Sequence, residues 1–435
     1  MERQQANSLF VFREFQGRRQ LVGELSREML ATFRYDAEYL ASPFAAPIST
    51  GLPLQDDPFD EAKTAAFFEG LVPEGSRRRD IARALRGDTA CFTHLLSSLS
   101  DETVGAILFA SARDVDWPCH YERLDEGWVS RFAAFPAAFS LEMGVRTRMS
   151  LAGAQDKVGL AFHKGAWYLP QGGAPSTYII KAASPAYPGE TLNEALCLGC
   201  ARRLGIETEQ VTLLAVADHD PLLAARRFDR TLPTDGGTSI DGVPIRWRLH
   251  QEDLCQASGL SSGLKYEPTG GHYTSRVAHT LQIRSCNASM DRLASFERLC
   301  LDYALGNCDN HLKNRALLYD AQWTCARLAP VYDIMCTTLY PGLYREMGVS
   351  FGNESRRIDD VTPADILKTA HAMGAFPEAT REILANLTGE LVRAIGEEGA
   401  ALEVQGFENA PSMAESIARD AEPRVEVLQQ ALASA

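Results

Sequence analysis

Residues 305–314 read Leu-Gly-Asn-Cys-Asp-Asn-His-Leu-Lys-Asn, and this stretch decides how the rest of the chain is interpreted. Just upstream, residues 295–304 place apolar side chains at positions i, i+3, i+4, i+7 and i+8 from Phe296, which is the pattern of one helix face. Gly306 is suited to end this helix, because glycine readily adopts the left-handed conformation of a C-terminal cap. The sequence therefore predicts a helix that stops at Gly306 and leads into a polar loop.

Asp309 and Asn314 lie five residues apart in this loop, which is the spacing of the protein-kinase catalytic loop. In that loop the Asp accepts the proton of the attacking hydroxyl and the Asn binds Mg²⁺. The spacing alone is weak evidence, since an Asp/Asn-rich loop is commonly just a turn. Other parts of a phosphotransferase must accompany the loop if this interpretation is to hold.

A strand lysine and a helix glutamate follow one another upstream of the loop. Residues 176–181 are β-branched and apolar, and they end in Lys181. Residues 193–204 form an amphipathic pattern with Glu194 in the first turn. In kinases a strand Lys contacts the α- and β-phosphates and is held by a helix Glu. The alternatives are a solvated lysine at the rim of a sheet and a glutamate that favours the helix dipole.

A second acidic residue follows the loop at the expected distance. Residues 315–319 and 323–328 predict a short hairpin, and the chain then reaches Asp333. Kinases place their second metal-binding Asp after such a hairpin. An isolated Asp at a strand end is most often a cap or turn residue. The five residues occur in the kinase order, however, so the combination indicates a phosphotransferase.

Residues 146–157 contain a small-residue loop before an apolar strand. Ala152, Gly153 and Ala154 would let backbone N–H groups approach an anion closely. The segment is neither a Walker A motif nor the glycine-rich loop of ordinary protein kinases. From composition alone a plain hairpin turn remains an alternative to a nucleotide loop.

The bulk composition excludes some classes of protein. The net charge of −14 argues against non-specific nucleic-acid binding as the main activity. The amino terminus has no apolar signal core, and no stretch approaches the roughly 20 apolar residues of a membrane span. We therefore expect a cytoplasmic protein that does not bind membranes.

Apolar periodicity predicts the remaining elements and three domains. The expected strands cover residues 8–12, 20–25 and 104–109, and the expected helical segments cover residues 58–70, 76–99, 249–260, 272–304 and 362–435. Residues 231–245 are expected to form a loop. The predicted domains are an N-terminal subdomain (1–112), a part with the phosphate loop and the lysine strand (113–230), and a helical part with the catalytic loop (231–435).

Six motifs together resemble those of the HipA toxins, which are serine/threonine kinases of bacterial toxin–antitoxin modules. They are S-L-A-G-A-Q-D-K at residues 150–157, T-Y-I-I-K at 177–181, R-F-D-R at 227–230, L-H-Q-E-D at 249–253, G-N-C-D-N-H-L-K-N at 306–314 and P-V-Y-D at 330–333. The likeness runs through nearly the whole chain, including the N-terminal module. It implies an α+β, two-lobed, protein-kinase-like fold with an accessory N-terminal subdomain and a helix-rich C-terminal lobe, which uses ATP and Mg²⁺.

The resemblance also implies a role for each site residue. Asp309 would be the catalytic base, Asn314 and Asp333 would hold Mg²⁺, and Glu194 would support Lys181 by an ion pair. The nucleotide would be bound by Ala152, Gly153, Ala154, Gln155, Asp156, Lys157, Lys181, Arg226, Phe228, His311, Asn314, Tyr332 and Asp333. Ser150 matches the autophosphorylated serine of the family, and a phosphate there would expel the adjacent loop by charge repulsion.

The same resemblance implies partners. They are a HipB-like helix-turn-helix antitoxin and a cytoplasmic protein substrate, typically a translation component such as an aminoacyl-tRNA synthetase. Two departures from the family pattern matter. Arg226 stands where the family often has Glu in the hinge, and the C-terminal region lacks a basic cluster. Contact with operator DNA is therefore expected only through the antitoxin.

Two other functions stay open at the level of the sequence. One is a catalytically weak corepressor that acts by binding the antitoxin, which the intact set of Asp309, Asn314 and Asp333 argues against. The other is a small-molecule or lipid kinase on the same scaffold, because the catalytic residues do not identify the acceptor.

Overall fold

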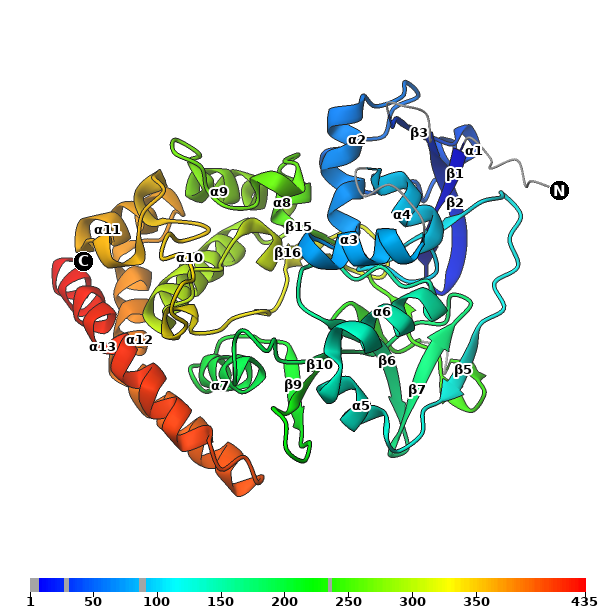
Figure 1. Cartoon of the computed structure of the whole chain (residues 1–435). Coiled ribbons are helices and arrows are strands. Elements are labelled where there is room, and N and C mark those ends of the chain that lie inside the picture. The colour runs from blue at the N-terminus through cyan, green and yellow to red at the C-terminus, as the bar shows by residue number, and fades with distance from the viewer. Residues whose placement is uncertain (1–7, 27–30, 86–90, 234–236) are drawn as a thin grey trace. The chain divides into compact units, whose positions relative to one another are not determined.

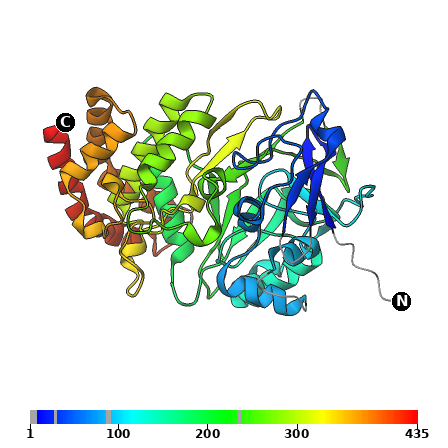
Figure 2. The same ribbon diagram turned by 90° about the horizontal axis from the view of Figure 1, so that it is seen from above.

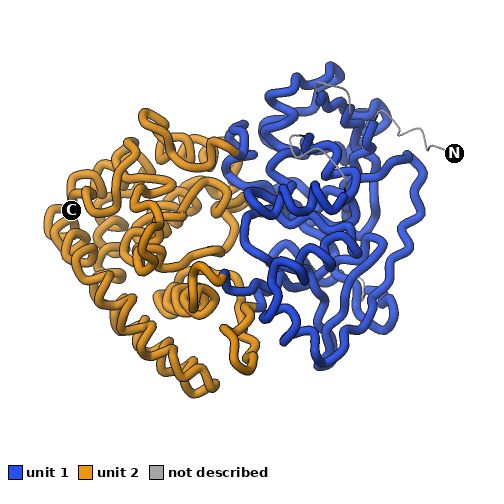
Figure 3. Tube along the Cα trace, in the orientation of Figure 1, with its two compact units in different colours: residues 1–184, 224–262, 318–325 blue, residues 185–223, 263–317, 326–435 orange. Residues whose placement is uncertain are grey.

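The computed structural model describes residues 8–26, 31–85, 91–233 and 237–435 of the 435-residue chain. The chain divides into two compact units (Figure 3). Unit 1 comprises Met1–Ser184, Ala224–Ser262 and Leu318–Cys325, and unit 2 comprises Pro185–Leu223, Gly263–Leu317 and Ala326–Ala435. Of the predicted segments, residues 86–90 and 234–236 lie outside the described residues. The predicted domain boundaries after residues 112 and 230 stay predictions.

The first sheet of unit 1 lies in the N-terminal part of the chain (Figure 1). Its strand order is β3-β2-β1-β4, with β1 at Ser8–Phe15, β2 at Arg18–Ser26, β3 at Phe33–Tyr35 and β4 at Ile107–Ala110. All neighbours are antiparallel. The strands predicted at residues 8–12 and 20–25 are confirmed. The strand predicted at residues 104–109 begins later than expected, at Ile107.

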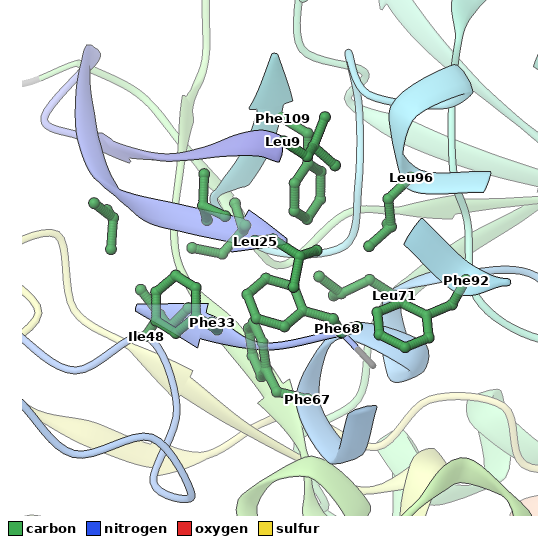
Figure 4. Close-up of a cluster of buried hydrophobic side chains, with 14 of the residues drawn as sticks. Leu9, Leu25, Phe33, Ile48, Phe67, Phe68, Leu71, Phe92, Leu96 and Phe109 are labelled. Atoms are coloured by element: carbon green, nitrogen blue, oxygen red, sulfur yellow. The ribbon is translucent and has the colours of Figure 1, made fainter. Parts of the chain in front are cut away.

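An aromatic cluster covers one face of this sheet (Figure 4). Phe33 lies 5.2 Å from Phe68 between ring centroids, and Phe67 lies 5.0 Å from Phe68. These rings are buried with Leu9 and Leu25 of the strands. The short helices around the sheet are α1 Ala37–Leu40, α2 Glu61–Phe68, the 3₁₀ turn Glu69–Leu71, α3 Gly75–Ala84 and α4 Phe92–Ser98. Burial of several aromatic side chains gives the module a hydrophobic core of its own.

The second sheet of unit 1 carries the residues expected to contact phosphates. Its strands within the unit lie in the order β5-β7-β6-β8-β10, with β5 at His120–Arg123, β6 at Lys157–His163, β7 at Ala166–Gln171, β8 at Tyr178–Lys181 and β10 at Leu222–Arg226. Helices α5 (Trp128–Ala134) and α6 (Pro136–Thr147) precede β6 in the chain, and α6 packs against β6 and β7.

Residues 249–260 were predicted to be helical, and this prediction is only partly right. Gln251–Asp253 form strand β15, and only Leu254–Ala257 form a helix, α8. Asp253 starts α8 with a capping box, in which its carboxylate accepts the N–H of Gln256 while the Gln256 side chain accepts the N–H of Asp253. Short antiparallel pairs flank this region, namely β11 (Arg230–Thr231) with β14 (Trp247–Arg248) and β12 (Ser239–Ile240) with β13 (Val243–Pro244).

Unit 2 is mostly helical. Its helices are α7 Glu190–Arg203, α9 Tyr273–Arg284, α10 Ala288–Leu305, α11 Pro363–Ala372, α12 Pro377–Val404 and α13 Ala410–Ser434. Helices α12 and α13 lie side by side and pack against α10, as the orange and red ribbons show (Figures 1 and 2). Unit 2 also contains strand β9 (Gln210–Leu214), strand β17 (Ala326–Leu328) and the first two residues of strand β16 (Ala316–Tyr319). The predicted helices over 295–304 and 362–435 are confirmed.

Across the described ranges, no helix combines the length and the hydropathy that crossing a bilayer requires.

His250 is a buried histidine of unit 1 that stays neutral in the folded state. Its ring stacks on Trp323 at 4.2 Å, and its Nε2 lies 2.9 Å from the carbonyl oxygen of Ile48. The ring is almost fully buried, and burial lowers the pKa of His250 to about 3. The unfolded chain binds a proton below its ordinary pKa of about 6.5, whereas the folded chain does not. This histidine therefore contributes stability above pH 6.5 that is lost as the pH falls toward 3.

We expect the folded protein to lose about 2 kcal/mol of stability between pH 7.5 and pH 5 through His250. Denaturant unfolding at the two pH values measures it, and His250→Phe, which keeps the stacking, is the comparison. The free energy of unfolding of the variant should fall by less than that of the unaltered protein over the same range. Equal losses in both proteins would contradict this assignment.

Candidate active site

The predicted catalytic loop begins where α10 ends in unit 2. Gly306 takes the left-handed conformation, with φ of 75°, as its prediction as a helix end requires. Thr337 then fixes the turn, since its hydroxyl donates to the Gly306 carbonyl and accepts the N–H of Cys308 at 2.9 and 2.8 Å. Asp309 follows with its side chain 50% exposed, while its neighbours Cys308 and Asn310 are buried. Hydrogen bonds thus fix the start of the loop, and the carboxylate of Asp309 is exposed to solvent.

Asparagines on either side hold the loop closed. The Asn307 side chain accepts the N–H of Asp309 at 3.1 Å, and the Asn314 side chain donates to the Asp309 carbonyl at 2.8 Å. Asn310 exchanges two hydrogen bonds of 3.1 Å with the backbone of Val349. The bond from Asn314 orients its amide and leaves the amide oxygen as the atom that suits a metal ion.

A buried ion pair lies behind the loop. Arg315 donates to Asp302 at 2.6 Å, and Asn307 donates to the other carboxylate oxygen at 2.8 Å. Burial raises the pKa of Asp302 and lowers that of Arg315 to about 10, and the attraction between the two opposes both shifts. Arg298, one turn earlier on α10, donates to the carbonyls of Asn314 and Tyr332. It therefore ties together the segments that carry the two predicted metal ligands.

Asp333 belongs to a cluster of three carboxylates within unit 2. One carboxylate oxygen each from Glu194, Glu209 and Asp333 lie within 4.8 Å of one another. Carboxylate oxygens gathered at this spacing are the ligands that a hard divalent cation prefers. Asp333 also has a φ of 49°, a left-handed conformation that Asp tolerates better than most residues. The donor set fits Mg²⁺.

Hydrogen bonds between backbone segments, together with those of one asparagine side chain, bring the three acids together. Glu209 donates its N–H to the Val331 carbonyl, and Val331 donates to Glu207, both at 2.9 Å. Asn193, beside Glu194 on α7, donates to the Cys336 carbonyl at 3.0 Å and accepts the Cys336 N–H at 2.8 Å. Sequence reasoning missed Glu209, because nothing local distinguishes it from other acids next to a strand.

His311 and Tyr332 also lie at the catalytic loop. His311 is buried, with its Nε2 3.8 Å from Asp309 Oδ1. The Tyr332 hydroxyl donates to the Lys313 carbonyl at 2.8 Å, and the Arg298 guanidinium lies 5.4 Å from the centre of the Tyr332 ring. Unit 2 thus brings together the predicted residues Asp309, His311, Asn314, Tyr332, Asp333 and Glu194.

The predicted phosphate loop lies in unit 1, between α6 and β6. Gly153 has a φ of 99°, and a Cβ atom there would lie 2.8 Å from Lys157 Nζ. The left-handed φ is the stronger reason for a glycine here, because the end of the Lys157 side chain could move away from a Cβ atom. Asp156 accepts the Ser140 hydroxyl at 2.8 Å, and Gln155 donates to the Ala182 carbonyl at 3.3 Å. Ala152 and Gly153 are half-buried, and Ala154 is exposed.

Two lysines face each other across the sheet at this loop. Lys157 on β6 and Lys181 on β8 are direct cross-strand partners, and both are buried. Directly opposed residues of an antiparallel pair point to the same face of the sheet. Two lysines on one face can both donate hydrogen bonds to an anion of high charge, such as a polyphosphate.

Residues 71–77 hold the phosphate loop by hydrogen bonds within unit 1. These contacts were not predicted from the sequence. Arg77 on α3 donates to the carbonyls of Gln155 and Lys157 at 3.0 and 2.9 Å. The Ser150 hydroxyl donates to the Leu71 carbonyl at 2.6 Å, and Ser150 is fully buried. Burial lowers the pKa of Arg77 to about 10, which leaves it charged at neutral pH.

The charged residues of the R-F-D-R motif form buried ion pairs, in addition to any contact that the motif makes with adenine. Arg227 and Arg230 form buried ion pairs with Asp229 and with Glu102, at 2.7 to 3.0 Å. Arg248 joins Glu102 to Glu14 of β1. Arg226 is exposed and Phe228 is half-buried. Their predicted contact with adenine stays a prediction.

Comparison with known proteins places the chain among kinase-like proteins. The model of the HipA N-terminal domain matches residues 17–110, and that of the HipA-like C-terminal domain matches residues 149–395. The candidate kinase Y4mE of Sinorhizobium fredii is 32% identical over 327 residues, which cover 74% of this chain and 75% of Y4mE. The serine/threonine-protein kinase toxin HipA of Shewanella oneidensis is 26% identical over 355 residues, or 77% of each chain.

A solved structure resembles nearly the whole chain. It is the complex of HipA, HipB and operator DNA from Shewanella oneidensis MR-1, with a TM-score of 0.79 and 19% sequence identity. The similarity covers 98% of this chain and 99% of the matched one. At this identity the likeness concerns the fold.

Proposed function

The chain belongs to the HipA family of kinases, and we propose that it is an ATP- and Mg²⁺-dependent serine/threonine-protein kinase toxin. The observation that carries the proposal is the catalytic loop, where Asp309 alone reaches solvent from a loop held by buried asparagines. The carboxylate cluster that contains Asp333 supports it. The opposed lysines support the use of a nucleoside triphosphate.

The chemistry follows from these groups. Asp309 accepts the proton of the acceptor hydroxyl while the hydroxyl oxygen bonds to the γ-phosphorus of ATP and the bond to the β-phosphate bridging oxygen breaks, releasing ADP. Lys157 and Lys181 neutralise phosphate charge. Mg²⁺, held by Asn314 and Asp333, would neutralise the charge that develops on the phosphate oxygens. Glu194 and Glu209 lie close enough to Asp333 to share in holding the ion.

Ser150 is proposed as the site of autophosphorylation. Its hydroxyl is buried against Leu71, so it must leave this contact before it can accept a phosphate. A phosphate carrying about −1.5 to −2 charges could not return to the same place beside the Leu71 carbonyl. The phosphate loop would then lose its docked conformation, and the kinase would inactivate itself.

The proposed partners follow from the family. We propose a HipB-like helix-turn-helix antitoxin that contacts operator DNA, a cytoplasmic protein as substrate, typically a translation component such as an aminoacyl-tRNA synthetase, and growth arrest or persistence as the outcome. The net charge of −14 agrees with indirect rather than direct contact with DNA.

The test is phosphate mapping by mass spectrometry. The purified protein is incubated with Mg²⁺-ATP and cell extract, with Asp309→Asn as the inactive control. We expect phosphate on Ser150 and on at least one extract protein, and a Ser150→Ala variant should stay active for longer under ATP. Phosphate on neither would refute the proposal, and phosphorylation of a metabolite or lipid alone would favour a small-molecule kinase.

Arg77→Ala is expected to raise the KM for ATP about tenfold, because two loop carbonyls lose their charged donor. The effect on kcat should be smaller, since Arg77 acts only through the docking of the loop. Steady-state kinetics with varied ATP measures both values. Arg79→Ala, an exposed position on the same helix, should leave both unchanged. A KM for ATP within twofold of the unaltered value would show that the loop docks without Arg77.

A further inference from the structure

Tyr266 contacts the proposed catalytic base directly, and this contact was not predicted from the sequence. Its hydroxyl donates a hydrogen bond to Oδ1 of Asp309, and both residues belong to unit 2. The ring of Tyr266 meets the ring of His311 edge to face, with 4.9 Å between centroids. A hydroxyl that donates to this carboxylate is the arrangement that a kinase needs for its acceptor.

The backbone on both sides of Tyr266 is fixed. The carbonyl of Lys265 accepts the N–H of Leu312 at 3.1 Å, which joins it to the catalytic loop. On the other side, Glu267 donates its N–H to Gly348 at 2.8 Å. The buried Glu267 carboxylate also accepts the N–H groups of Tyr273 and Ser350 at 2.8 and 2.9 Å. The position of Tyr266 over the loop is therefore built into the fold.

The side chain of Tyr266 is partly exposed to solvent. Its exposed fraction is 47%, and its ring also contacts the ring of His311. A half-exposed aromatic side chain can change rotamer on the nanosecond timescale, without any change in the elements that flank it. The contact with Asp309 can thus be broken and remade during a catalytic cycle.

We propose that Tyr266 is an internal competitor of the acceptor, whose hydroxyl occupies the position of the acceptor hydroxyl on Asp309 until a substrate displaces it. This inference rests on the proposed kinase function and on Asp309 as its base. Tyr266 would then affect the reaction only through its contact with Asp309. The same hydroxyl keeps water from that position and so restrains the hydrolysis of ATP. In that reaction water would bond to the γ-phosphorus and give its proton to Asp309, while the bond from the γ-phosphorus to the bridging oxygen breaks and ADP leaves.

The kinetic test uses Tyr266→Phe, which removes the hydroxyl and keeps the ring against His311. Without an added acceptor, the variant should hydrolyse Mg²⁺-ATP about fivefold faster, because a hydrogen bond to a charged group no longer competes with water. With dephosphorylated casein as the acceptor, the KM for casein should fall roughly three- to tenfold at nearly unchanged kcat. Tyr344→Phe, at a tyrosine that is 86% exposed, is the matched control and should change neither value.

A second measurement needs no enzymatic activity. In protein labelled with 3-fluorotyrosine, the ¹⁹F resonance of Tyr266 is identified by its loss in Tyr266→Phe. Replacing Asp309 by alanine should shift this resonance and leave that of Tyr344 in place. If the chemical shift of Tyr266 is the same in Asp309→Ala as in the unaltered protein, the inference is wrong, whether or not the protein is a kinase.

The two measurements separate failure of the inference from failure of the proposed function. If the resonance shifts but no phosphate is transferred or released by any form of the protein, the contact exists and the kinase proposal is wrong. If the protein is active and Tyr266→Phe has a raised KM for casein, a lowered kcat or unchanged values, Tyr266 does not compete with the acceptor.

Discussion

Replacing Asp309 by asparagine is expected to lower the rate of phosphoryl transfer about a thousandfold, because an amide cannot take the proton of the acceptor hydroxyl. Asparagine has the same shape and can still accept the hydrogen bond from Tyr266. The loop bonds to Asp309 involve its backbone, namely the N–H bonded to Asn307 and the carbonyl bonded to Asn314. The variant should therefore fold as the unaltered protein does.

Transfer of ³²P from Mg²⁺-ATP to extract proteins measures this effect, and thermal unfolding checks the fold. Asp360→Asn removes one exposed carboxylate elsewhere in unit 2 and serves as the control for the change in charge. We expect normal transfer by the control and an unchanged melting temperature for Asp309→Asn. Transfer by Asp309→Asn within tenfold of the unaltered rate would mean that Asp309 is not the base.

Glu102→Gln should cause the largest loss of stability, about 3–5 kcal/mol in unit 1, because it leaves buried positive charge without a partner. Glu102 is fully buried and pairs with Arg227, Arg230 and Arg248. Burial alone would raise the pKa of Glu102, but Arg248, Arg230 and Arg227 hold it below its ordinary value. The stabilisation is therefore present above pH 4.5 and is lost as the pH falls further.

Denaturant unfolding at pH 7 tests this prediction. Glu122→Gln is the matched control, since Glu122 pairs with Arg146 at 2.7 Å but is 45% exposed. A surface pair contributes about 0–1 kcal/mol, so the control should change little. If both variants lose equally little stability, the buried network does not hold unit 1 together.

The predictions that held rest on local patterns. The α10 helix and its end at Gly306 follow from side-chain periodicity and from the freedom of glycine, and both are properties of a few neighbouring residues. The order of Lys181, Glu194, Asp309, Asn314 and Asp333 along the chain indicated a phosphotransferase. The resemblance of the surrounding motifs to the HipA family implied the α+β kinase-like fold. The family matches and the structural likeness confirm that fold.

The contacts that the sequence did not reveal join residues far apart in the chain. Arg77 meets the phosphate loop 78 residues away, and Tyr266 meets Asp309 43 residues away. An exposed-looking Arg on a polar helix and a Tyr in a loop carry no local sign of such partners. The strand β15 was likewise predicted as helix, because a run of three residues is too short for its period to be read.

The buried ion pairs of unit 1 also bear on how this protein can be recombined with its relatives. Glu102 lies within the segment matched by the N-terminal family model, and Arg227, Arg230 and Arg248 lie within the segment matched by the C-terminal one. A chimaera that joins the N-terminal domain of one member to the kinase domain of another must therefore keep both sides of these ion pairs. The carboxylate comes from the first domain and the guanidinium groups come from the second. Both domains should therefore be taken from the same family member.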